Sequence, residues 1–148
     1  MTTLIQNRKA GFNYEFLEKM EAGIELLGFE VKSLKNKRGS LDGSHVSVKK
    51  GEAYVLNLDI PPYQAGNTPS DYDPRRERKL LLTRHEIKKL VDIEKQKGLT
   101  IVPISVYTKN NRVKVGLAIA RGKKKYDKRE IIKKRDTERE IGRKLKGL

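Results

Sequence analysis

Two clusters of basic residues carry the chemistry that this sequence offers, which is the binding of phosphate. The first is Arg75-Arg76-Glu77-Arg78-Lys79, which directly precedes three leucines. The second is the C-terminal segment 121–148, where 13 Lys and Arg accompany 5 Asp and Glu. Arginine binds phosphate with a fixed fork geometry, and each cation that reaches a nucleic-acid phosphate releases a condensed counterion. The clusters therefore predict a polyanionic partner, and nucleic acid is the first candidate. Considered alone, the first cluster could equally be a solvated charged run before a helix.

Positive charge extends over the whole chain. The 148 residues carry 34 basic and 19 acidic side chains, a formal net charge of +15. Residues 1–120 hold 21 of the basic and 14 of the acidic residues, so the body has a surplus of its own. Such a surface attracts RNA or anionic lipid over long distances. No apolar stretch approaches the roughly 20 residues of a membrane span, and the N-terminus lacks a signal-peptide pattern. We therefore expect a cytoplasmic protein with no membrane partner.

Few residues could perform catalysis. His45 and His85 do not form a metal-ligand spacing, and Asp71-Tyr72-Asp73 is better explained as a turn than as a cation site. The chain has no cysteine, which excludes a thiol nucleophile and disulfides and most structural zinc sites. We expect a protein that is no enzyme, with no catalytic residue, no metal and no cofactor.

Strand patterns occupy most of the body. A first hairpin is predicted around Lys49-Lys50-Gly51-Glu52, and a second between residues 100–107 and 113–120, where two asparagines tolerate the positive φ of a tight turn. Segment 14–26 is ambiguous between strand and helix, and Gly23 favours a strand. Strand alternation predicts that the following residues share buried faces: Tyr54, Leu56, Leu58 and Ile60 in the first hairpin, and Val113, Val115, Leu117 and Ile119 in the second.

Two helices and one long loop complete the pattern. Thr83 and Glu86 form a capping box and Gly98 follows, which predicts a helix from about residue 84 to 97. Residues 29–37 predict a shorter helix with Val31 and Leu34 inward and its lysines outward. Segment 61–74 contains four prolines, and ordered loops of this length are uncommon unless they have a function.

These elements predict a mainly β fold with short helices. Four or five short strands with one capped helix between them fit an OB-fold-like β-barrel, whose open face suits oligonucleotides. We divide the chain into a barrel, residues 1–122, and a basic C-terminal tail, residues 123–148. The apolar residues of the tail are too scattered for a continuous stripe, so we expect it to be disordered when free. We expect a monomer.

Short motifs along the chain are together highly specific. In order, they are Asn7-Arg8-Lys9-Ala10, Glu21-Ala22-Gly23-Ile24, Glu30-Val31-Lys32-Ser33-Leu34 after Gly28, Pro62-Tyr63, Asp73-Pro74-Arg75-Arg76, Arg78-Lys79-Leu80-Leu81-Leu82, Glu86-Ile87, Gly122-Lys123-Lys124 and Tyr126-Asp127-Lys128-Arg129. From about residue 5 to the end, the sequence resembles the bacterial SsrA-binding protein family, also called small protein B. Three positions depart from the family pattern: Phe29 stands where Thr is usual, Tyr72 where His is frequent, and Thr83 where His commonly follows the leucines.

The resemblance implies an RNA-binding adaptor. Such a protein binds the tRNA-like domain of transfer-messenger RNA and delivers it to stalled ribosomes for trans-translation, in which the ribosome is rescued and the peptide tagged. The implied RNA-binding residues are Asn7, Arg8, Lys9, Glu30, Lys32, Ser33, Arg75, Arg76, Arg78, Lys79, Lys123 and Lys124. The tail is implied to become helical in the mRNA channel beside the decoding site and ribosomal RNA. Its implied contacts are Tyr126, Asp127, Lys128, Arg129, Lys133, Lys134, Arg135 and Arg139.

A ribosomal structural protein with a basic extension is the alternative, because its composition would be equally suitable. The tail favours the adaptor, since Glu130 with Lys134 and Glu140 with Lys144 have helix-compatible spacing that a merely charged extension does not need. A nuclease ranks third, because the sequence lacks the carboxylate cluster or histidine pair that would hold its metal.

Overall fold

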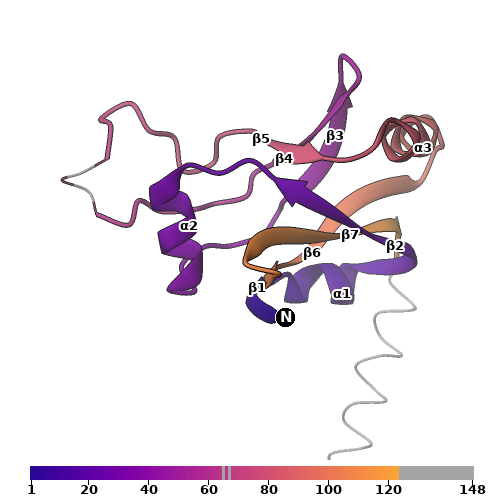
Figure 1. The fold of residues 1–148 in the computed structure, drawn as a ribbon. Helices are drawn as coiled ribbons and strands as arrows, with labels where there is room; N and C mark the ends of the chain where they lie inside the picture. The colour runs from indigo at the N-terminus through magenta and orange to yellow at the C-terminus, as the bar shows by residue number, and fades with distance from the viewer. Residues whose placement is uncertain (65, 67, 124–148) are drawn as a thin grey trace, which may run out of the picture.

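Seven antiparallel strands form one sheet in the computed structural model, which describes residues 1–64, 66 and 68–123 (Figure 1). The strands are β1 (Thr2–Gln6), β2 (Tyr14–Ile24), β3 (His45–Lys49), β4 (Glu52–Leu56), β5 (Arg78–Leu81), β6 (Leu99–Lys109) and β7 (Arg112–Gly122). The helices are α1 (Arg8–Asn13), α2 (Gly28–Lys35) and α3 (Arg84–Glu94). No helix in this described part is long and apolar enough to cross a membrane.

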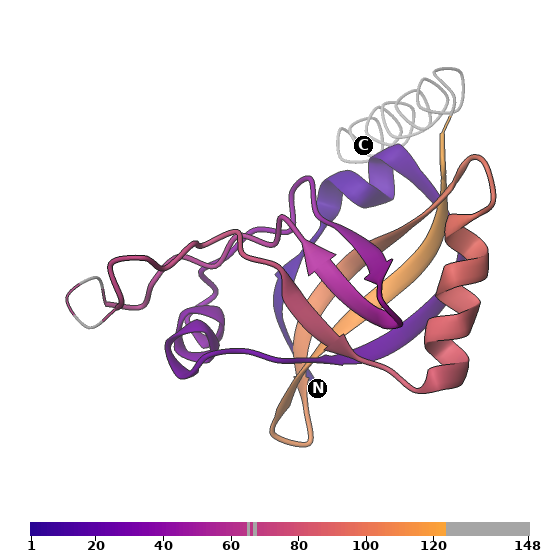
Figure 2. The same ribbon diagram turned by 90° about the horizontal axis from the view of Figure 1, so that it is seen from above.

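The sheet curls into a small barrel. Its strand order is β1-β6-β7-β2-β5-β4-β3, and β3 at one edge also packs near β6, so the two ends of the sheet approach each other (Figure 2). The predicted mainly β architecture with short helices is confirmed, and the curled sheet is consistent with the predicted OB-fold-like barrel. Of these strands, β1 and β5 were not predicted, because each is short and neither shows a clear alternation of apolar and polar residues.

The two hairpin turns form as predicted, because the residues at their tips can adopt positive φ. Between β6 and β7, Asn110 has φ 52° and Asn111 has φ 61°, the left-handed pair of a type I′ turn. Between β3 and β4, Lys50 and Gly51 have φ 50° and 77°. The long β6–β7 strand pair that results is the main structural framework of the barrel.

The predicted buried face of β4 was wrong. Ala53 and Val55 are fully buried, whereas Tyr54 and Leu56 are only half-buried. Asn57, with φ 61°, then breaks the extended conformation. The alternation restarts after Asn57, and the inward positions change from odd-numbered to even-numbered residues. Leu58 and Ile60 are therefore buried as predicted.

Strand β7 is buried on both faces in its second half. Val115 and Leu117 pack into the main core, while Ala118 and Ala120 pack on the other face with Ala10 of α1. The sequence correctly separated the two faces of β7 and missed α1, whose six residues are too few for a helical periodicity.

The two predicted helices are present. Thr83 Oγ1 accepts from the amide of Glu86 at 3.2 Å, and Glu86 Oε1 accepts from the amide of Thr83 at 3.0 Å, which is the predicted capping box. Helix α3 ends at Glu94, three residues earlier than predicted. Helix α2 ends at Lys35, two residues earlier than predicted. Leu34 is fully buried and Lys32, Lys35 and Lys37 are exposed as predicted, whereas Val31 is only half-buried.

Candidate nucleic-acid interface

A buried carboxylate joins α2 to the segment between β4 and β5. The side chain of Glu30 is fully buried, and it accepts hydrogen bonds from six groups. They are the Leu27 amide at 2.8 Å, Arg76 Nε at 3.2 Å, Arg76 Nη2 at 2.6 Å, Arg78 Nε at 2.8 Å, Arg78 Nη2 at 2.6 Å and the Tyr72 hydroxyl at 2.8 Å. Because Glu30 lies on α2 and its side-chain donors come from the loop 61–77 and from β5, Glu30 fixes all three elements to one another.

The electrostatics of this cluster keep Glu30 ionised. Burial alone would raise the pKa of Glu30, but hydrogen bonds from Arg76, the Leu27 amide and Arg78 outweigh burial and lower the pKa to about 2. Burial and the hydrogen bond to Glu30 raise the pKa of Tyr72 to about 12, so Tyr72 stays a neutral phenol. Two guanidinium groups and one carboxylate leave the cluster with one net positive charge.

Arg78 lies in the protein interior. Its side chain is fully buried, and besides Glu30 it donates to the carbonyls of Leu58 at 2.5 Å, Pro74 at 3.0 Å and Arg76 at 3.2 Å. The sequence interpretation placed this guanidinium beside RNA phosphate, and the structure places it under the loop. Arg78 and Glu30 therefore act by shaping the surface, because both are enclosed by protein. Their neighbour Ser33 is also buried and donates to the Pro61 carbonyl at 2.6 Å.

Three predicted cations lie on α2 and on the loop, the two elements that the Glu30 cluster joins. Lys32 and Arg75 are exposed, and about one third of the Arg76 side chain is exposed while its guanidinium contacts Glu30. Lys32 Nζ lies 6.0 Å from the centre of the Tyr63 ring, and Arg75 Nε lies 3.8 Å from a carboxylate oxygen of Asp59. Figures 1 and 2 show the loop and α2 at the same end of the barrel. We call this α2–loop surface, formed by Lys32, Arg75, Arg76 and Tyr63, the basic end.

Reversing the charge of Lys32 should weaken RNA binding. Lys32 is exposed on α2, so Lys32→Glu leaves the buried cluster intact and removes one cation from the basic end. We expect affinity to fall on the order of tenfold and the slope of log K against log salt to become shallower by about one to two phosphate contacts. Lys97→Glu, an equal charge change at an exposed position after α3, is the control. An equal loss for both variants would show that only net charge matters.

A second group of predicted residues surrounds α1. Asn7 is buried and caps this helix, since its Oδ1 accepts from the Ala10 amide at 3.2 Å and its Nδ2 donates to the Pro103 carbonyl at 2.9 Å. Arg8 and Lys9 are exposed on the helix. Asn7 therefore holds the start of α1, whereas Arg8 and Lys9 are open to solvent.

Two further contacts connect α1 to the rest of the molecule. Lys123 Nζ donates to the Gly11 carbonyl at 3.1 Å, near the C-terminal end of α1, where a cation is favourable. Arg8 lines a hollow of about 440 Å³ together with Lys37, which follows α2. One α1 cation, Arg8, and Lys37 after α2 thus border the same hollow.

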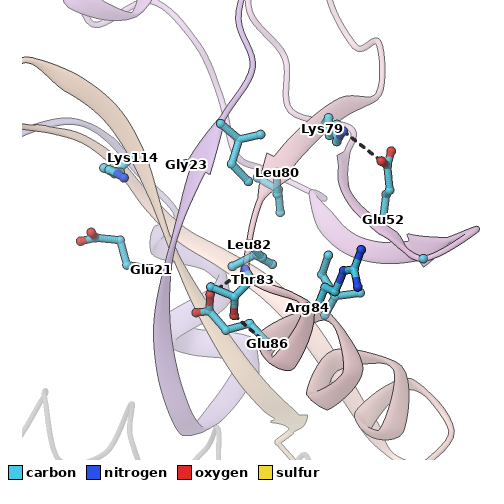
Figure 3. A pocket seen from close by; sticks show the side chains of 13 residues that line it. Glu21, Gly23, Glu52, Lys79, Leu80, Leu82, Thr83, Arg84, Glu86 and Lys114 are labelled. Atoms are coloured by element: carbon cyan, nitrogen blue, oxygen red, sulfur yellow. Dashed lines mark hydrogen bonds and ion pairs between the residues drawn. The ribbon is translucent and has the colours of Figure 1, made fainter.

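Lys79 lies apart from the basic end. It follows Arg78 on β5 and so points to the opposite face of the strand, where its Nζ lies 3.0 Å from Glu52 Oε1. Figure 3 shows the hollow of about 630 Å³ that it lines beside the start of α3. The charged residues around that hollow are Glu21, Glu52, Glu86, Lys79, Arg84 and Lys114. Because both signs alternate there, this hollow lacks the uniform charge of a phosphate-binding surface.

The structure adds two residues that sequence reasoning missed. Tyr63 contributes its exposed ring beside Lys32, and its carbonyl accepts from Arg38 Nη1 at 3.3 Å. Tyr72 joins the buried cluster, although the surrounding Asp71-Tyr72-Asp73 indicated only a turn. The Pro-Tyr sequence in a long loop was an available signal for Tyr63; no local pattern indicates that Tyr72 points inward.

The remaining predicted site residues lie outside the described part of the chain. They are Lys124, Tyr126, Asp127, Lys128, Arg129, Lys133, Lys134, Arg135 and Arg139. Their roles stay predictions.

Comparison with known proteins finds one family along nearly the whole chain. A family model described as SmpB protein matches residues 4–147. An SsrA-binding protein of Acetivibrio thermocellus is 52% identical over 141 residues, 95% of this chain and 91% of the relative. One of Clostridium acetobutylicum is 49% identical over 144 residues, 97% of this chain and 92% of the relative.

A solved structure shares the fold as well as the sequence. It is described as "tmRNA-SmpB: a journey to the center of the bacterial ribosome", and it matches with a TM-score of 0.69 and 46% sequence identity. The match covers 82% of this chain and 85% of the other. Matches of this extent and identity, together with the family model, show that this chain belongs to the SmpB protein family.

Proposed function

We propose that this protein is an RNA-binding adaptor that binds the tRNA-like domain of transfer-messenger RNA and delivers it to stalled ribosomes for trans-translation. The observation that carries the proposal is the near full-length match to SsrA-binding proteins. The similar solved structure, whose description names tmRNA-SmpB and the bacterial ribosome, supports the ribosome as second partner. An adaptor acting with ribosomes works in the cytoplasm, where we place it.

The basic end supplies the binding surface of the barrel. Lys32, Arg75 and Arg76 are held on α2 and the loop by the buried Glu30 cluster, so their spacing is fixed before RNA arrives. Folded RNA is recognised mainly through its shape, phosphates and 2′-hydroxyls, which such a surface can contact without reading a base sequence. Recognition and delivery require fixed cations and no reacting group, so we propose a binding factor and not an enzyme.

We also propose that the barrel, residues 1–122, and the basic tail, residues 123–148, act as separate parts. A chain ending at Tyr126 should keep its cooperative melt and most of its affinity for the isolated RNA. The cut spares Lys123, whose amide donates to the Asn13 carbonyl at 2.9 Å and whose Nζ caps α1. Thermal melts and RNA titrations of both chains check this. A melting temperature lower by many degrees would contradict the division.

The RNA that co-purifies with the protein from its own cells tests the proposed function. One small structured RNA, identified by sequencing as transfer-messenger RNA, is the expected result. Bulk ribosomal RNA without it would favour the ribosomal structural protein with a basic extension and contradict the adaptor. Lys32→Glu, compared with Lys97→Glu in the same experiment, should reduce the yield of the small RNA selectively.

A further inference from the structure

Tyr72 connects three segments of the chain at one point. Its hydroxyl lies 2.8 Å from Glu30 Oε2 on α2 and 2.8 Å from the carbonyl oxygen of Ile60, and it accepts from Arg78 Nη2 at 3.0 Å. Its ring contacts Phe29 edge to face, with centroids 4.7 Å apart and planes at 83°. The single proton of the hydroxyl is shared between two acceptors while a guanidinium donates to its oxygen, so the hydroxyl acts as donor and acceptor at once.

The inward position of Tyr72 is a local feature of the loop. Ser70, Asp71 and Asp73 around it are exposed, whereas Tyr72 is partly buried. A turn closes before it, with the Tyr72 amide donating to the Pro69 carbonyl at 3.1 Å, and another after it, with the Arg76 amide donating to the Asp73 carbonyl at 3.1 Å. Tyr72 therefore fastens a solvated loop to the barrel immediately before the loop presents Arg75 and Arg76.

The hydroxyl of Tyr72 and the side chain of Arg76 meet on the same carboxylate. Arg76 Nε lies 3.2 Å from Glu30 Oε2, the oxygen that also accepts from Tyr72, and Arg76 Nη2 lies 2.6 Å from Oε1. Anything that turns this carboxylate also turns the partly exposed guanidinium of Arg76. The orientation of Arg76 relative to Lys32, two residues after Glu30 on α2, consequently depends on Tyr72.

We propose that Tyr72 is a positioning residue for RNA binding: it holds the loop 61–77 on α2 so that Arg76 and Lys32 face the RNA backbone together. Tyr72 makes no RNA contact in this arrangement and acts through Glu30 and Arg76. The inference rests on the proposed function, because it specifies how the basic end is set for a folded, tRNA-like RNA.

Tyr72→Phe in the full chain tests the proposal, because it removes the hydroxyl and keeps the ring on Phe29. Glu30 retains its bonds to Leu27, Arg76 and Arg78, so we expect the fold to persist with a small decrease in melting temperature. The probe is a transcript of the tRNA-like domain of transfer-messenger RNA. We expect affinity to fall about fivefold to tenfold and the salt slope to become shallower by about one phosphate contact.

The salt slope separates positioning from mere stability. A purely structural Tyr72 would reduce the folded fraction, which lowers apparent affinity and leaves the number of phosphate contacts unchanged. A lower melting temperature with an unchanged slope would therefore overturn the proposal. So would an affinity and slope equal to those of the original protein.

Tyr107→Phe is the matched control. The hydroxyl of Tyr107 on β6 donates to Glu21, and burial followed by this bond raises the pKa of Tyr107 to about 12, as at Tyr72. Tyr107→Phe thus removes an equivalent hydroxyl–carboxylate bond outside the basic end, and affinity and slope should stay within twofold; a loss equal to that of Tyr72→Phe would overturn the proposal. If the original protein showed no preference for the tRNA-like transcript over an RNA duplex of equal length, the proposed function would fail instead.

Discussion

Replacing Glu30 with alanine should lower the free energy of unfolding by about 3–5 kcal/mol, because the change leaves Arg78 buried without a counter-charge. The Arg78 side chain is wholly enclosed, and after the change its remaining partners include the carbonyls of Leu58, Pro74 and Arg76. Carbonyl dipoles compensate a buried guanidinium only partly. Urea unfolding followed by circular dichroism measures the loss.

The same change should weaken RNA binding although it makes the protein more positive. Without the carboxylate, Arg76 loses two hydrogen bonds and the Tyr72 hydroxyl loses its bond to α2, so Arg76 is no longer held in a fixed orientation at the basic end. Glu77→Ala is the matched control, since it deletes the acid that lies between Arg76 and Arg78 in the sequence. The ion pair of Glu77 with Lys49 is exposed and contributes at most about 1 kcal/mol. Equal or tighter RNA binding by Glu30→Ala would contradict the role assigned to Glu30.

Low pH should reproduce part of the loss of stability expected for Glu30→Ala. The pKa of Glu30 is lowered to about 2 in the folded protein, against 4.5 for an ordinary glutamate. A carboxyl whose folded pKa is depressed contributes stability above its unfolded pKa, and that contribution disappears as pH falls from about 4.5 towards 2. The full window corresponds to about 3 kcal/mol. Unfolding curves at pH 7 and pH 3 should therefore differ less for Glu30→Ala than for the original protein; an identical pH dependence would assign the acid sensitivity to other carboxylates.

Elements with short-range signals could be predicted from the sequence. The β6–β7 hairpin rests on two asparagines at its turn, and α3 on a capping box within four residues, so both were found. The buried face of β4 was assigned wrongly because a single positive φ at Asn57 shifts the alternation, and asparagine occurs in many other conformations. Leu81, the second of the three leucines after the basic cluster, is half exposed, because it occupies the outward position of β5.

The sequence predicted which residue types form the site but not which of these residues are buried. The basic run 75–79 and the lysines of α2 indicated phosphate binding, and Lys32 and Arg75 are indeed exposed. Glu30 and Arg78 are 48 residues apart, and nothing in either local sequence indicates that the two bury each other. Buried ion pairs are set by tertiary packing, so a sequence pattern assigns such residues to the surface by default. Glu30 and Arg78 were both predicted to contact RNA, and the structure places both beneath the surface, where they support it.

Replacing Asp127, Lys128 and Arg129 together by alanine should abolish tagging on stalled ribosomes while leaving RNA binding by the barrel nearly intact. The expectation rests on the sequence of the tail, where these residues follow Tyr126 and precede the cations Lys133 to Arg135. Dense positive charge needs phosphate to relieve its self-repulsion, and a channel lined with ribosomal RNA supplies it. We propose that the tail binds there, and that Tyr126 with Lys128 and Arg129 forms the junction that sets its direction.

A second triple variant separates position from bulk charge. Glu140, Arg143 and Lys144 also comprise one acid and two cations, so their replacement by alanine changes net charge by the same amount. Both variants should bind the tRNA-like RNA within about twofold of the original protein, because the basic end is unchanged. In a reconstituted translation assay with stalled ribosomes, the 127–129 variant should give no tagged peptide and the 140–144 variant a substantial yield. If the two lose activity equally, the tail contributes only its total charge, and normal tagging by the 127–129 variant would remove the junction from the mechanism altogether.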